Sequence, residues 1–106
     1  MLRYLIGFSY FFFQFNYCQE KISLWPFGVP NQKKSGEFER IIETEIIRID
    51  NVQNPTLEIY LPSRNIRTDQ AVIIFPGGGY EFLAYDWEGT DFAKSLNAKG
   101  ISAFVL

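Results

Sequence analysis

The 106-residue sequence contains no histidine and only one cysteine, Cys18. Without histidine, no serine–histidine pair can form from the residues of this chain. A single cysteine excludes an intramolecular disulfide, and the same shortage leaves too few ligands for a zinc cluster built from cysteine and histidine. We therefore expect neither a metal nor a cofactor.

Basic residues are not in excess either. Ten Lys and Arg residues stand against twelve Asp and Glu residues, which gives a net charge of −2. Because no basic patch is present to meet phosphates, nucleic acid is not an expected partner. The length allows one domain at most.

The N-terminus has the pattern of a secretory signal. Arg3 supplies a positive start, and residues 5–15 form an apolar stretch within the usual signal range of about 7–15 residues. The stretch is too short for a membrane-spanning helix, which needs about 20 residues. We predict a signal peptide over residues 1–18, cleaved before Gln19, and a secreted or periplasmic protein with no stable membrane span after cleavage. An uncleaved membrane anchor, a lipid on Cys18 and a buried N-terminal segment remain alternatives.

The first half of the remaining chain reads as strands after an irregular start. Residues 19–35 are rich in Pro, Gly and Asn and are expected to form an irregular lead-in. Residues 41–50 mix isoleucines with charged residues, which indicates a half-buried strand. Residues 51–55 have the composition of a turn, and residues 56–61 alternate with period two. We predict that the two strands form an antiparallel pair.

The second half predicts a strand, a helix and a further strand. Residues 71–75 are apolar without alternation, which is typical of a strand covered on both faces. Residues 88–99 form a helical pattern with Asp86 as a candidate cap, and residues 101–106 form another apolar strand. The three elements would make a right-handed crossover. The last strand would lack a flanking partner, and on this ground we expect a truncated domain.

Three glycines follow the strand at 71–75. Glycine allows a sharp turn with positive φ and a close approach to the backbone. Backbone N–H groups left free at such a turn can stabilise a developing negative oxygen. A plain tight turn and a dinucleotide-binding loop are the alternatives. The second is disfavoured because Phe82 occupies the third glycine place of G-x-G-x-x-G and no acidic residue lies near residues 97–98.

Four blocks, in order, carry a family resemblance: LWPFGVPN at 24–31, PTLEIYLP at 55–62, PGGGY at 76–80 with EG at 88–89, and GISAFVL at 100–106. Together they resemble the α/β-hydrolase superfamily, and within it the bacterial esterases and lipases that include acetylxylan- and feruloyl-esterase-like enzymes. The resemblance implies that residues 36–106 are the N-terminal portion of an α/β-hydrolase domain. That portion would consist of an antiparallel strand pair followed by strand, glycine loop, helix and strand, truncated before the nucleophile elbow.

The same resemblance implies roles for the glycine loop. In this superfamily the loop between the third strand and the first helix supplies part of the oxyanion hole. Gly78 and Gly79 stand at the expected donor positions, Gly77 at a turn position, and Tyr80 near the substrate entrance. Pro76 departs from the histidine that many relatives carry there, so a side chain that could brace the loop is missing.

The implied function is that of an exported serine esterase. Its substrate would be a small ester or an acylated polysaccharide. No serine lies in a G-x-S-x-G context, so the nucleophile, the acid and the histidine would lie outside these residues. The 106-residue chain alone is therefore expected to be inactive.

Other interpretations stay open at this point. The chain could be a non-catalytic interaction module whose last strand pairs with a partner, or a hydrolase homologue that has lost catalysis. The pair Glu88–Gly89 recurs in the resembling family, and its simplest explanation is a helix start with a close contact. Trp25, Trp87 and Tyr85 are expected to be packing residues, with sugar stacking as the alternative.

Overall fold

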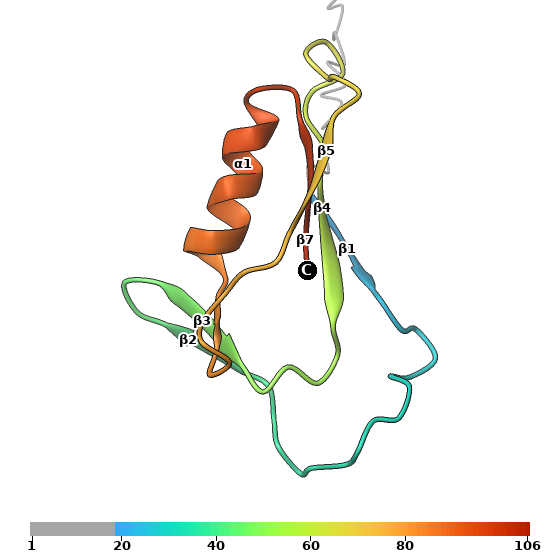
Figure 1. Ribbon diagram of the computed structural model, residues 1–106, viewed down its shortest axis with the longest axis vertical. Coiled ribbons are helices and arrows are strands. Elements are labelled where there is room, and N and C mark those ends of the chain that lie inside the picture. Colours follow the sequence, from blue (N-terminus) through green and yellow to red (C-terminus); the bar gives the residue numbers. More distant parts are fainter. Residues whose placement is uncertain (1–18) are drawn as a thin grey trace, which may run out of the picture.

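The computed structural model describes residues 19–106, so the predicted signal peptide at 1–18 lies outside the described residues. The fold mixes α and β structure and consists mostly of strands, with two sheets and one short α-helix (Figure 1). The elements follow the chain as β1 (Gln19–Ser23), β2 (Arg40–Glu43), β3 (Ile47–Asp50), β4 (Thr56–Tyr60), β5 (Ala71–Ile74), β6 (Leu83–Ala84), the π-helical turn η1 (Asp86–Thr90), α1 (Asp91–Asn97) and β7 (Ser102–Val105).

The larger sheet has the order β1-β4-β7-β5. Strand β4 is antiparallel to both of its neighbours, whereas β5 and β7 are parallel. The helix α1 connects these two parallel strands and lies beside the sheet (Figure 1). The predicted order of strand, glycine loop, helix and strand is thus present.

The core lies between α1 and this sheet. Ala93 from the helix packs with Tyr60, Ala103 and Val105 from the sheet, and each of these four residues is at most 2% exposed. Leu96 lies at the margin of the cluster. The helix α1 covers Asp91–Asn97 and is shorter than the predicted span of residues 88–99. Gly100, which follows its last turn, adopts a φ of +79° that favours glycine. Neither helical element within residues 19–106 has the length and apolar character needed to cross a membrane.

The smaller sheet corrects the predicted pairing of residues 41–50 with residues 56–61. Residues 41–50 do not form one strand: β2 and β3 form an antiparallel hairpin, and β6 pairs with β3. The chain reverses at Thr44, whose N–H and hydroxyl both donate to the carbonyl oxygen of Ile46. Strand β4 pairs instead with β1, which occupies the first residues of the predicted irregular lead-in.

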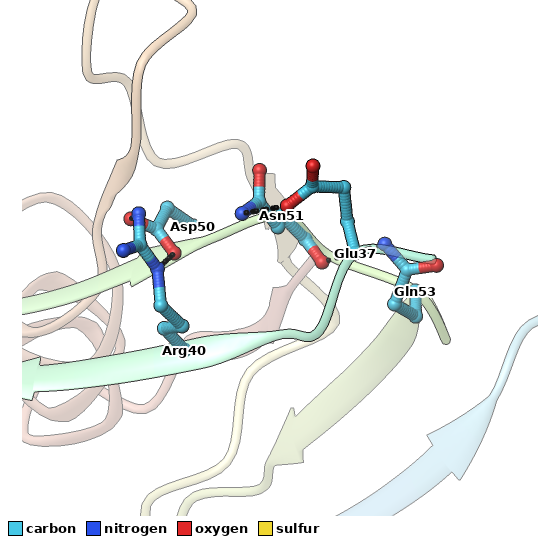
Figure 2. A network of polar contacts seen from close by, with 5 residues as sticks. All are labelled: Glu37, Arg40, Asp50, Asn51 and Gln53. Carbon is cyan, nitrogen blue, oxygen red and sulfur yellow. Dashed lines mark hydrogen bonds and ion pairs between the residues drawn. The ribbon is translucent and has the colours of Figure 1, made fainter. Parts of the chain in front are cut away.

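Polar contacts hold the open end of this hairpin (Figure 2). The Arg40 guanidinium donates to both carboxylate oxygens of Asp50 at 2.8 and 2.6 Å. Asn51 donates to the Glu37 carboxylate at 3.5 Å, and the side-chain amide of Gln53 donates to the Asn51 carbonyl at 3.0 Å. The bidentate pair joins residues that face each other in the β2–β3 register.

Strand β5 is not covered on both faces, contrary to the prediction. Among the described residues it lies at the edge of the larger sheet, and Val72 and Ile73 are 39% and 60% exposed. The last strand β7, expected to lack a flanking partner, lies instead between β4 and β5. Burial on both faces depends on the neighbours of a strand and cannot be read from its apolar composition alone.

The predicted cap of the helix is also wrong. The residue at the N-cap of α1 is Thr90, which makes no side-chain capping bond. Asp86 begins η1 and accepts hydrogen bonds from the N–H groups of Trp87 and Ile47, both at 2.9 Å. Asp86 therefore ties η1 to β3 of the smaller sheet.

Candidate functional site

The glycine loop, residues 76–80, follows β5 directly. The Gly77 carbonyl accepts the Ala84 N–H at 2.8 Å, and the Gly78 carbonyl accepts the Glu81 N–H at 3.2 Å. Both carbonyls therefore point into the turn that leads to β6.

The N–H groups of the same two peptide units, which belong to Gly78 and Gly79, point the other way. The described chain has no cis peptide bond, and in a trans peptide the C=O and N–H bonds are directed oppositely. The N–H groups of Gly78 and Gly79 are therefore directed away from the turn. Within residues 19–106, no hydrogen bond uses either of these groups. They are the two N–H groups that the family resemblance assigns as oxyanion donors.

The positions of Gly78 and Gly79 favour glycine for different reasons. A Cβ on Gly78 would overlap the carbonyl oxygen of Phe82. Gly79 has open space around it but adopts a φ of +65°, and Tyr80 follows with +66°. Two successive left-handed residues turn the chain sharply, and the Tyr80 side chain is left fully exposed.

Gly77 differs from the other two glycines because its N–H is already bonded. It donates to the Glu88 carboxylate at 2.7 Å. The loop is also supported at its root, where the ring of Pro76 packs closely against Gly89: a Cβ built on Gly89 would lie 3.0 Å from Pro76 Cγ and 3.0 Å from Val105 Cγ1. The structure thus brings the two parts of the predicted motif, residues 76–80 and 88–89, into direct contact.

The buried carboxylate of Glu58 bonds to the segment that follows the glycine loop. Glu58 on β4 is 7% exposed. It accepts the Tyr85 hydroxyl at 2.7 and 2.8 Å, accepts the Tyr60 hydroxyl at 3.0 Å, and pairs with the Lys21 ammonium at 2.6 Å. Tyr85 lies between β6 and η1, so its hydroxyl ties the end of the loop segment to the larger sheet.

At neutral pH the Glu58 carboxyl is ionised and the Tyr85 hydroxyl is neutral. Burial alone would raise the pKa of Glu58, but the bonds from Lys21, Tyr85 and Tyr60 outweigh it and hold the pKa below its ordinary value. Burial, and next the bond to Glu58, raise the pKa of Tyr85 well above its ordinary value. A carboxylate that stays ionised beside a phenol that stays neutral holds a structure together and does not exchange a proton.

The sequence pattern did not reveal this cluster. Alternation in β4 places Leu57 and Ile59 on one face, continued by Leu61 just after the strand, and Thr56, Glu58 and Tyr60 on the other. The face with Glu58 and Tyr60 is the buried one, while Leu61 is 42% exposed. The one available signal was a glutamate flanked at two residues by a tyrosine, which can bond it on the same strand face.

A pocket of about 310 Å³ lies between the two sheets. Its walls are mainly apolar and include Ile41 and Ile49 from the hairpin, Leu83 from β6 and Val105 from β7, and Lys21, Glu58 and Tyr85 add polar groups. Pro76 lines the pocket, but Gly78, Gly79 and Tyr80 do not. The predicted donors are therefore beside this pocket and outside it.

Trp87 in η1 was expected to be a packing residue, and that prediction is wrong. Its side chain is 59% exposed and lines a surface hollow with Thr44, Glu45, Ile46 and Arg48. Trp25 is 42% exposed. Of Trp25, Trp87 and Tyr85, only Tyr85 has a side chain held by a strong hydrogen bond, which it donates to Glu58.

Comparison of this chain with protein-family models, with curated proteins and with solved structures finds no match.

Proposed function

We propose that this chain carries the oxyanion-hole loop of an exported carboxyl-ester hydrolase with an α/β-hydrolase fold. The observation that supports the proposal best is the pair of unbonded N–H groups on Gly78 and Gly79, directed away from the turn. Their place in the chain agrees with the family pattern. In chain order β5 is the third strand of the larger sheet, and the loop leads from it to the single α-helix of the described residues.

The chemistry that such a loop performs is stabilisation of charge. A serine oxygen attacks the ester carbonyl carbon, and the carbonyl oxygen takes up negative charge in the tetrahedral intermediate. The two N–H groups would donate to that oxygen, and loss of one donor of this kind typically lowers the rate by about 10²–10³. Because the donors are backbone groups held by a sheet and a turn, they need no rearrangement during the reaction.

The remaining catalytic groups would come from other polypeptide. The chain has no histidine, so the base that activates the serine cannot be one of these 106 residues. We propose that the whole protein acts on acyl esters of polysaccharides, with Tyr80 at the substrate entrance, and that the 106 residues alone give no turnover.

Two experiments test this function. The reading frame beyond residue 106 should encode a G-x-S-x-G elbow followed by an aspartate or glutamate and a histidine, and its absence would remove the proposal. The full-length protein should hydrolyse p-nitrophenyl acetate, and this activity should fall when the elbow serine is replaced by alanine. An intact triad without turnover would instead indicate a homologue that has lost catalysis.

One observation favours a second candidate function, that of an interaction module. Strand β5 presents an apolar edge among the described residues, with Ile73 60% exposed. Such an edge can accept an added strand from a partner. A sharp, cooperative melt of residues 19–106 as a monomer, together with no ester turnover by the full-length protein, would favour this function over the esterase.

A further inference from the structure

Glu88 is the one side chain that bonds directly to the backbone of the glycine loop among the described residues. We propose that Glu88 is a positioning residue, whose carboxylate holds Gly77 and thereby keeps the N–H groups of Gly78 and Gly79 directed outward. Its effect on catalysis rests on the proposed esterase function. Its effect on the loop conformation does not.

The contact has the geometry of a strong bond. The Gly77 nitrogen lies 2.7 Å from Glu88 Oε2, a distance typical of hydrogen bonds to an ionised acceptor. A Cβ on Gly77 would lie only 2.7 Å from the same oxygen. The carboxylate therefore lies in the space that a side chain at position 77 would need, and glycine is what allows it to come so close.

The bond fixes more than one peptide. The Gly77 N–H is held by Glu88, and the Gly77 carbonyl is held by the Ala84 N–H at 2.8 Å. Because the peptides on both sides of Gly77 are restrained, the orientation of the Gly78 N–H is determined. The Gly78 carbonyl, bonded to Glu81, then determines the orientation of the Gly79 N–H in the same way.

The carboxylate is itself anchored to the sheet. Glu88 belongs to η1, and the next residue, Gly89, is buried in close contact with Pro76 and Val105. The backbone under Glu88 therefore cannot move without disturbing the contact with β7. The position of the loop is in this way set by the sheet, through η1 and one side chain.

A different explanation for an acidic residue here is the favourable charge near a helix start. The two explanations make opposite predictions for two conservative variants. Glu88→Gln keeps the reach and the acceptor oxygen but removes the charge, whereas Glu88→Asp keeps the charge but is shorter by one methylene. A positioning role predicts that Gln replaces Glu and Asp does not, and a helix-start role predicts the reverse.

The loop contact can be measured by NMR without any activity. Pro76–Gly77 is the only Pro–Gly pair among these 106 residues. Proline labelled at the carbonyl carbon and glycine labelled at nitrogen give HNCO peaks for Pro–Gly pairs alone, and the peak that disappears in Pro76→Ala is that of the Gly77 amide. In the full-length protein we expect this proton to be shifted downfield, to stay downfield in Glu88→Gln, and to move upfield in Glu88→Asp and Glu88→Ala. An unchanged peak in Glu88→Ala would overturn the proposal.

The catalytic consequence is measured with p-nitrophenyl acetate. Glu88→Ala and Glu88→Asp should lower kcat by about 10²-fold, the loss that a misplaced catalytic group can cause, with KM changed by less than about twofold. Glu88→Gln should stay within about threefold of the wild type. The matched control is Asp91→Asn, which removes an exposed acid from the first turn of α1 and should leave kcat unchanged. Equal kcat in all four variants would overturn the positioning role. If the wild type has no ester turnover, the proposed function fails, and the Gly77 peak alone decides whether Glu88 holds the loop.

Discussion

Replacing Tyr85 by phenylalanine tests whether the buried cluster holds the loop segment to the larger sheet. The substitution keeps the ring and removes only the hydroxyl, which donates to Glu58 at 2.7 and 2.8 Å. A hydrogen bond to a charged group contributes about 1.5–3 kcal/mol, and Glu58, at 7% exposed, has little water to replace the lost donor. Because Lys21 and Tyr60 still bond the carboxylate, we expect a loss of about 2 kcal/mol in the free energy of unfolding.

The assay is urea unfolding of the full-length protein at neutral pH, followed by circular dichroism. The matched control is Tyr80→Phe, because Tyr80 lies on the same loop but is fully exposed. Its effect should stay within about 0.5 kcal/mol. Equal midpoints and slopes for the two variants would refute the reasoning, because they would show that the bond between Tyr85 and Glu58 contributes nothing to stability.

Three further predictions follow from the same structure. The lowered pKa of Glu58 means that its contribution is present above its ordinary value of 4.5 and is lost as the pH falls through the folded pKa, so thermal melts should show an acid loss that Glu58→Gln lacks. The raised pKa of Tyr85 means that its contribution is present below its ordinary value of 10.0 and is lost as the pH rises through the folded pKa, so the melting temperature should fall in alkali for the wild type and less for Tyr85→Phe. Gly78→Ala should destabilise the protein by about 1–3 kcal/mol because its Cβ would overlap the Phe82 carbonyl oxygen. Gly79→Asn should be milder because the space around Gly79 is open and Asn tolerates a positive φ. Urea midpoints that rank the two variants the other way would contradict the loop geometry.

The sequence predicted those elements whose formation depends on residues close together in the chain. The turn at Gly100 after the helix and the strand before the glycine loop follow from residue type, the first from a glycine and the second from a short apolar run. The contact between Gly77 and Glu88 joins the segments PGGGY and EG, which form one block of the family resemblance. The expected chemistry of Gly78 and Gly79 remains a prediction.

Features that depend on distant partners could not be predicted. The burial of Glu58 arises because Tyr85, 27 residues away, reaches the same strand face. The exposure of β5 arises from its place in the strand order. The division of residues 41–50 into two strands depends on a turn at Thr44 that has neither glycine nor proline to mark it.

The most direct test of the oxyanion role is a crystal structure of the full-length protein after reaction with a p-nitrophenyl alkylphosphonate, which mimics the tetrahedral intermediate. We predict that a phosphonyl oxygen lies about 2.7–3.1 Å from the nitrogen atoms of both Gly78 and Gly79. A phosphonyl oxygen bound by other groups, with these two N–H groups directed elsewhere, would contradict the account.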